Sequence, residues 1–235
     1  MDENEMLFAM YNALANIAQE RSQDVKKYLK IRKLHQEIYD SMSKYMDNNM
    51  FLHDQVLEAE SQEIDLNLKD EHEYRLFIEL MIYPQTPKVK SVTEVYLEKN
   101  KLRNAQKVAL LKAMIDSQCL VFQIIERDEK NALVTVENFY THEQIKISDL
   151  NLGKYNMGKD IYFCSRIIYY DGIYFQTGLS MMFKRNGTTK KWLKTNKQLS
   201  HPHWRVKDWI IVEEFYRKYG LCRYKPISVA RKNHR

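Results

Sequence analysis

Basic residues and tryptophans alternate near the C-terminus, and they have the clearest chemical potential in this sequence. Lysine and arginine side chains can bind phosphates, and a tryptophan ring can stack on a nucleic-acid base. Trp192 lies among four lysines, and two further basic residues separate Trp204 from Trp209. The pattern predicts a nucleic-acid-binding surface that comprises Lys190, Lys191, Trp192, Lys194, Lys197, Arg205, Lys207, Lys218, Arg231 and Lys232.

Two other interpretations of this segment are open. In the first, the basic residues dock on an acidic surface of this chain or of another protein, so the segment serves protein–protein interaction or regulation. In the second, the tryptophans are core residues and the lysines form a solvated face. Apolar residues at helical spacing from Trp209 favour a core position for that tryptophan.

Charge is unevenly distributed along the 235 residues, whose net charge is +6. Residues 1–183 hold 22 Lys or Arg and 28 Asp or Glu, a net charge of −6. Residues 184–235 hold 15 Lys or Arg and 3 Asp or Glu, a net charge of +12. A basic segment after an acidic body indicates either an anionic partner or a segment that folds back on the body.

Residues that could bind a metal or act in catalysis are scattered. His201 and His203 flank a proline, but zinc needs three or four ligands and only Cys222 is near in sequence. His142 and Glu143 lie in a predicted turn, where no acid–base partner is recognisable. One run of carboxylates has the residue types of a metal-dependent nuclease, although such runs are usually solvated. Its members are Glu58, Glu60, Glu63, Asp65, Asp70, Glu71 and Glu73.

These observations favour a non-enzymatic protein without a metal or cofactor, and a metal-dependent hydrolase ranks third among the interpretations. The three cysteines form no Cys-x-x-Cys pair, which suits a reducing compartment. The acidic start MDENEMLF lacks the basic region of a signal peptide, and no apolar run approaches the ~20 residues that span a bilayer. We therefore expect a cytoplasmic protein without membrane contact.

Helical periodicity dominates the first half of the chain. Pro84 and Pro87 interrupt it, and Ser91 and Glu94 are spaced as a capping box that starts a new helix. The pattern predicts helices over residues 6–18, 25–45, 50–59, 70–83, 92–98 and 104–117, and over 188–198 and 204–219 in the basic segment.

The apolar period changes to two after residue 118, which predicts β-strands. Asp171-Gly172 is a strong signal for a tight hairpin, because both central residues of a type I′ turn need positive φ. Arg166 falls in a predicted strand, and the alternation there places it on the solvent face. The expected strands cover residues 119–126, 134–137, 144–147, 161–170 and 173–183, with a loop over 149–159.

Several of these features occur in an order seen elsewhere. An aromatic helix over 73–77 precedes the run 91–97, a Gly-Lys-Asp step over 158–160 and the Tyr170-Asp171-Gly172 hairpin. In this order, residues 70–183 resemble the region ahead of the SEC-C zinc motif in uncharacterised bacterial proteins. The resemblance implies a cytosolic bacterial protein with a helical front and a small β-module, and it brings no catalytic residues. The Cys-rich motif is absent here, so zinc is not implied.

The sequence as a whole predicts an α+β protein. N-terminal helices pack on a small five-stranded antiparallel sheet or open barrel, and a basic helical C-terminal segment lies alongside. The expected regions are 1–118 (helical), 119–184 (β-meander) and 185–235 (basic), with 119–235 forming one unit with 70–118. We expect the functional surface where the sheet meets the basic segment.

Overall fold

The computed structural model describes residues 23–49, 71–83, 90–154, 160–204 and 206–221. Helices come first: α2 (Gln23–Asp47), α4 (Glu71–Ile82), α5 (Val92–Lys99) and α6 (Ala105–Ile115). The strands are β1 (Gln118–Asp128), β2 (Leu133–Asn138), β3 (Gln144–Ser148), β4 (Ile161–Tyr170) and β5 (Ile173–Lys184), with α7 (Leu150–Lys154) after β3. The chain continues with α8 (Gly187–Thr195), the 3₁₀ turn η2 (Lys197–Ser200) and α9 (Val206–Tyr219).

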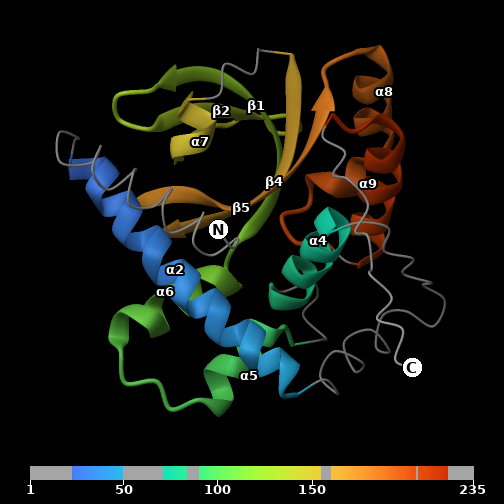
Figure 1. Ribbon diagram of the computed structural model, residues 1–235. Coiled ribbons are helices and arrows are strands. Elements are labelled where there is room, and N and C mark those ends of the chain that lie inside the picture. The colour runs from blue at the N-terminus through green and yellow to red at the C-terminus, as the bar shows by residue number, and fades with distance from the viewer. Residues whose placement is uncertain (1–22, 50–70, 84–89, 155–159, 205, 222–235) are drawn as a thin grey trace, which may run out of the picture.

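The five strands form a closed barrel in the order β1-β2-β3-β5-β4 (Figure 1). The α+β class is as predicted, but the expected antiparallel sheet or open barrel is wrong. Four strand pairs are antiparallel, and β3 pairs with β5 in parallel through Ile147 and Tyr174. An odd number of strands cannot alternate in direction around a closed ring, so closure requires at least one parallel pair.

The barrel has an apolar interior, and part of its outer face is apolar as well. The interior cluster consists of Phe122, Ile124, Val134, Val136, Ile147, Leu152, Phe163 and Ile167. Residues of opposite parity, such as Cys119 and Val121 of β1, pack outward against the helices in a larger cluster. Successive residues of a strand point to opposite faces, so a strand that is covered on both faces is apolar throughout, as β4 is.

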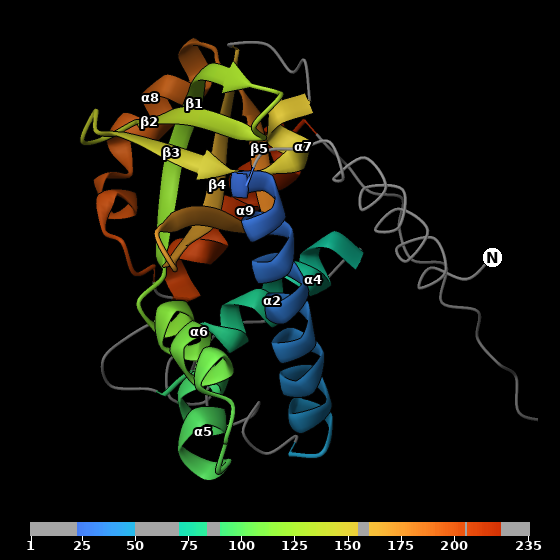
Figure 2. The ribbon, with the colours of Figure 1, turned by 90° about the vertical axis from the view of Figure 1, so that its left-hand side faces the viewer.

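Helices cover part of this barrel. In Figures 1 and 2, α2 runs along one side, α5 and α6 lie at one end, and α8 and α9 lie on the side away from α2. The larger cluster includes Met42 of α2, Met81 of α4, Leu111 of α6, Phe183 of β5 and Val212 of α9. The larger cluster therefore joins described helices of the helical front, the outer face of the barrel and the described part of the basic segment.

Several local predictions are confirmed. Ser91 accepts a hydrogen bond from the Glu94 amide, and the Glu94 carboxylate accepts one from the Ser91 amide, which completes the capping box of α5. Asp171 and Gly172 have φ of 49° and 80°, as a type I′ hairpin requires. The strand over 161–170 has the predicted bounds.

Other expectations differ from the structure or lie outside the described residues. The loop expected over 149–159 begins with α7, because Asp149 accepts hydrogen bonds from the amides of Asn151 and Leu152 and starts a helical turn. The helices expected over 6–18 and 50–59 lie outside the described residues. None of the described helices is both long and apolar enough to span a membrane.

Candidate nucleic-acid interface

Helix α8 presents its lysines on one exposed face. Asn186 caps the helix by accepting a hydrogen bond from the Thr189 amide at 2.9 Å. Thr189 and Leu193 are buried against the rest of the molecule. With 3.6 residues per turn, this register turns Lys190, Lys191 and Lys194 toward solvent, and all three are exposed. The positions of the apolar residues in α8 thus determine where its charges point.

The end of α8 is fixed by the barrel. The Tyr140 hydroxyl, in the β2–β3 turn, lies 3.1 Å from both the Leu193 and Asn196 carbonyl oxygens and donates there. The chain then enters η2, where Lys197 is exposed and Leu199 is buried. The basic face of α8 and η2 is therefore held on a rigid support.

This surface lacks compensating negative charge. Residues 184–207 hold eight Lys or Arg and no Asp or Glu. Within the described part of the chain, no carboxylate lies within 4 Å of the ammonium groups of Lys190, Lys191, Lys194 or Lys197. We call these four exposed lysines the basic surface.

The other predicted contact residues lie elsewhere. Lys207 and Lys218 of α9 are exposed, and the Lys218 ammonium lies 5.2 Å from the centre of the Tyr219 ring. Helix α9 also carries Asp208, Glu213 and Glu214, so it adds little net charge. Arg205, Arg231 and Lys232 lie outside the described residues.

The three tryptophans near the basic surface pack against the rest of the molecule. Trp204 is fully buried and donates from Nε1 to the Leu199 carbonyl at 3.1 Å, and Trp209 packs against its edge. Trp192 is half-buried, and one face of its ring stacks on Phe215 with centroids 4.0 Å apart. The core interpretation is confirmed for Trp204 and Trp209, and the covered face of Trp192 is not available to a base.

The candidate metal and acid–base residues do not converge. His201 Nδ1 accepts a hydrogen bond from the His203 amide at 3.1 Å, and His142 pairs with Glu137 at 3.4 Å. Among the described residues, no three His, Cys, Asp or Glu are grouped as metal ligands. Cys222 lies outside the described residues, as does the carboxylate run up to Asp70.

Arg166 is a buried residue, so the prediction of a solvent-facing side chain is wrong. The strand alternation places it on the outer face of the barrel, but helices cover that face. Its guanidinium lies 4.8 Å from the centre of the Tyr83 ring and donates from Nη1 to the Ser117 hydroxyl at 3.2 Å. Strand β4 has apolar residues at both odd and even positions, and this pattern was the sequence signal that both faces of the strand are covered.

A cluster of titratable residues surrounds Arg166 and joins α2 and α4 to the barrel. Burial raises the pKa of Glu79 to about 7, although the Thr177 hydroxyl, which donates to Glu79 at 2.5 Å, opposes this shift, as do Arg166 and Arg32. Burial and, to a smaller extent, Arg32 lower the pKa of His35 to about 3. His35 Nε2 lies 2.9 Å from the Tyr83 hydroxyl. These contacts link α2 and α4 to the barrel through buried polar groups.

Comparison with known proteins gives a family assignment. No curated protein and no solved structure matches the chain. The model of a family of unknown function (DUF7986) matches residues 22–224, which includes the helical front, the barrel and the basic surface. The chain belongs to this family.

Proposed function

We propose that this protein is a non-enzymatic binding protein whose basic surface contacts the phosphates of nucleic acid. The carrying observation is the exposure of Lys190, Lys191, Lys194 and Lys197 on one rigid face without carboxylates in ion-pair range among the described residues. Phosphate neutralisation with release of counterions is the main source of affinity for such a surface.

The geometry favours contact with the phosphate backbone over contact with bases. Trp192, which lies in α8 with three of the lysines, has one ring face stacked on Phe215. Lysine ammonium groups act as point charges and carry no sequence information when they bind phosphates. The expected binding is therefore independent of sequence and strongly dependent on salt.

The cellular compartment of the protein and its resemblance to the region ahead of the SEC-C motif are separate from the proposal of nucleic-acid binding. Cys119 and Cys164 are buried and form no disulfide. Free thiols are the usual state of cysteine in the reducing cytoplasm, so they fit a cytoplasmic site of action. The resemblance of residues 70–183 to the region ahead of the SEC-C motif supplies no binding residues. The basic surface alone supports nucleic-acid binding.

Fluorescence anisotropy with generic single- and double-stranded probes over a range of salt concentrations tests the proposal. If all four lysines contact phosphates of duplex DNA, log K should fall with log[salt] at a slope of about −3.6. The variant Lys190→Gln/Lys191→Gln/Lys194→Gln should reduce the magnitude of that slope by about 2.7. Affinity at low salt should fall accordingly.

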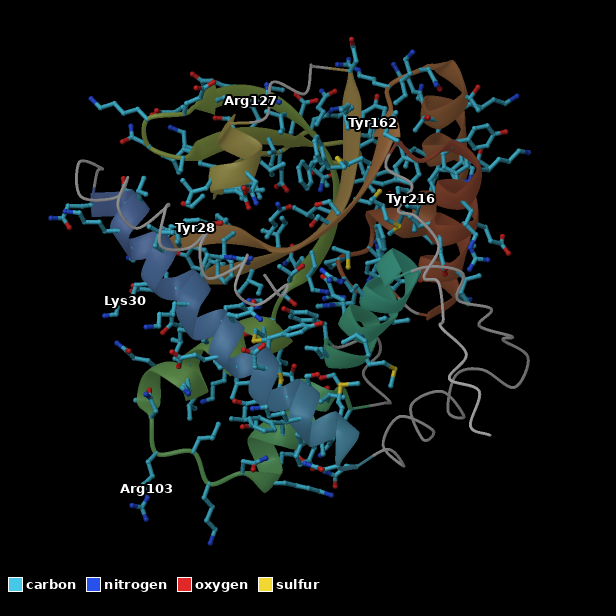
Figure 3. The ribbon with its side chains drawn as sticks, viewed as in Figure 1. Tyr28, Lys30, Arg103, Arg127, Tyr162 and Tyr216 are labelled. Carbon is cyan, nitrogen blue, oxygen red and sulfur yellow. The ribbon has the colours of Figure 1, made fainter. Side chains whose placement is uncertain are left out.

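A variant matched in charge controls for net charge alone. Lys99, Lys101 and Arg103 are exposed near α5 and α6, and Figure 3 shows Arg103 far from α8 and α9. Lys99→Gln/Lys101→Gln/Arg103→Gln should leave the slope nearly unchanged. Absence of binding at low salt, or equal effects of both variants, would reject the proposal. Binding to an acidic protein instead would support the docking interpretation.

A further inference from the structure

The barrel is open at the end that faces α6 and η2. A pocket of about 530 Å³ occupies this mouth, which is within the usual size range of small-molecule sites. Helix α7 lies at the opposite end, where Leu152 joins the interior cluster. Mouths of β-barrels are common ligand sites because a rigid wall of strands surrounds them.

The floor of the pocket is apolar and one wall is aromatic. Leu120, Ile145 and Ile167 line it from the barrel interior. Tyr169 and Tyr174, paired across β4 and β5, have ring centroids 4.7 Å apart and are 56% and 37% exposed. Large aromatic side chains that stay exposed beside a cavity offer an apolar surface and electron-rich ring faces to a ligand.

All the charge in the pocket lining is negative. Asp116 and Glu143 line the pocket, whereas no Lys, Arg or His does so among the described residues. Residues 1–183, which supply all of the described lining except Ser200 and Pro202, have a net charge of −6. Neither carboxylate has a basic side chain within 4 Å in the described part of the structure. The described lining of this cavity therefore carries negative formal charge that no neighbouring basic side chain balances.

Asp116 occupies a position that does not favour a carboxylate. It is the C-cap residue of α6, where the helix dipole places partial negative charge. His203 interacts electrostatically with Asp116, but burial and, to a smaller extent, Arg166 lower the pKa of His203. These two effects oppose protonation of the imidazole, so His203 offsets the charge of Asp116 less than an unperturbed histidine would. A bound cation would balance both the carboxylate and the helix end.

The rim of the pocket is fixed before a ligand arrives. The Thr141 hydroxyl donates to the Glu143 carboxylate at 3.3 Å, and the Asn138 amide donates to the Glu143 carbonyl at 2.9 Å. On the other side, the Cys119 amide donates to the Pro202 carbonyl at 2.8 Å and holds the segment after η2 against β1. A preformed rim reduces the entropy lost on binding.

We propose that the barrel mouth binds a small organic cation that has an apolar body. The apolar body contacts the floor of the barrel, and the cationic group lies against the faces of Tyr169 and Tyr174 near the carboxylates of Asp116 and Glu143. Cations are attracted to aromatic faces as well as to carboxylates. This inference does not depend on nucleic-acid binding, because none of the four lysines of the basic surface lines the pocket.

Three probes that share a phenyl ring test the sign of the charge that is recognised. Benzyltrimethylammonium, benzyl alcohol and benzenesulfonate should be titrated against the full chain by saturation-transfer NMR and calorimetry. The ammonium compound should bind about tenfold more tightly than either of the others. Equal affinity for the three probes, or no binding of the ammonium compound at millimolar concentration, would overturn the proposal.

Charge variants locate the site. Asp116→Asn/Glu143→Gln should weaken binding of benzyltrimethylammonium about tenfold. The matched control, Glu126→Gln/Glu129→Gln, removes two exposed carboxylates near the β1–β2 turn at the opposite end of the barrel and should have no effect. Equal losses in the two double variants would show a response to net charge only and would overturn the proposal.

Aromatic variants separate ring contacts from packing. Tyr169→Phe/Tyr174→Phe keeps both ring faces and should retain the affinity, whereas Tyr169→Leu/Tyr174→Leu should weaken binding about fivefold to tenfold. The variant Lys190→Gln/Lys191→Gln/Lys194→Gln should bind the ammonium compound as the unmodified chain does. Equal affinity of the Leu and Phe variants would overturn the assignment of the cation to the tyrosine wall.

Discussion

Two buried side chains near Arg166, Glu79 and His35, have opposite effects on the pH dependence of stability. Folding raises the pKa of Glu79 from 4.5 to about 7, so its contribution is full below pH 4.5 and is lost as pH rises through 7. Folding lowers the pKa of His35 from 6.5 to about 3, so its contribution is full above pH 6.5 and is lost as pH falls toward 3. Between pH 4.5 and 6.5 the Glu79 contribution falls with rising pH while the His35 contribution rises, so the free energy of unfolding changes little from these two groups.

Replacement of Glu79 by Gln should leave His35 as the main source of the pH dependence of unfolding free energy among these two groups. Gln resembles the neutral carboxyl and can still accept the Thr177 hydrogen bond. At pH 8 the variant should be more stable than the unmodified chain by up to about 3 kcal/mol, because no buried carboxylate ionises. Its stability should fall steadily from pH 6.5 to 4.5. Urea unfolding across this range measures both effects.

Glu129→Gln is the matched control for Glu79→Gln. Glu129 is exposed in the β1–β2 turn, so Glu129→Gln should leave the pH profile unchanged. If Glu79→Gln has the same profile as the unmodified chain from pH 4.5 to 8, the carboxyl of Glu79 does not retain its proton in the folded state.

At the scale of elements, the hairpin between β4 and β5 depends on one glycine. Gly172 has φ of +80°, and an added Cβ would meet only the Lys27 ammonium at 3.7 Å, an ordinary contact. The penalty of Gly172→Ala is therefore conformational and should be about 1 kcal/mol of unfolding free energy. Thermal or urea unfolding gives this value.

Gly187, at the start of α8, provides the matched control. No heavy atom lies within 4 Å of a Cβ added there, and its φ is not positive. Alanine is the better helix former, so Gly187→Ala should be neutral or stabilise the fold by a few tenths of a kcal/mol. Equal destabilisation by both substitutions would mean that the positive φ of Gly172 adds no specific penalty for alanine.

At the scale of the whole molecule, the larger hydrophobic cluster makes the described C-terminal helices part of the fold. Leu193 of α8 is fully buried in the same cluster as Phe183 of β5 and Met42 of α2. Leu193→Ala should lower the free energy of unfolding by about 2–5 kcal/mol. Because the cluster is continuous, the loss should appear as one cooperative transition.

Two probes can distinguish a single unit from separate regions. All three tryptophans lie between residues 192 and 209, so their emission reports on the C-terminal helices, whereas far-UV circular dichroism reports on the whole chain. In Leu193→Ala both signals should change at the same urea concentration. An early tryptophan transition with unchanged dichroism would indicate that residues 185–235 fold separately from the barrel.

Local sequence signals predicted the elements of this protein well. The bounds of β4, the Asp171-Gly172 hairpin and the capping box of α5 follow from interactions within a few residues. The exposed positions of Lys190, Lys191 and Lys194 likewise follow from helical periodicity. The sequence by itself therefore determined most of the described helices and strands, apart from the short helix α7, and where positive charge accumulates.

The tertiary structure decided what lies next to each element. Pairing of β4 with β1 and of β5 with β3 joins segments far apart in the chain, and barrel closure by five strands requires the parallel pair. The helices that cover the outer face of the barrel bury Arg166, and the fold gathers Asp116, Glu143 and the tyrosine pair at one mouth. These contacts depend on the packing of distant segments, which local periodicity does not specify.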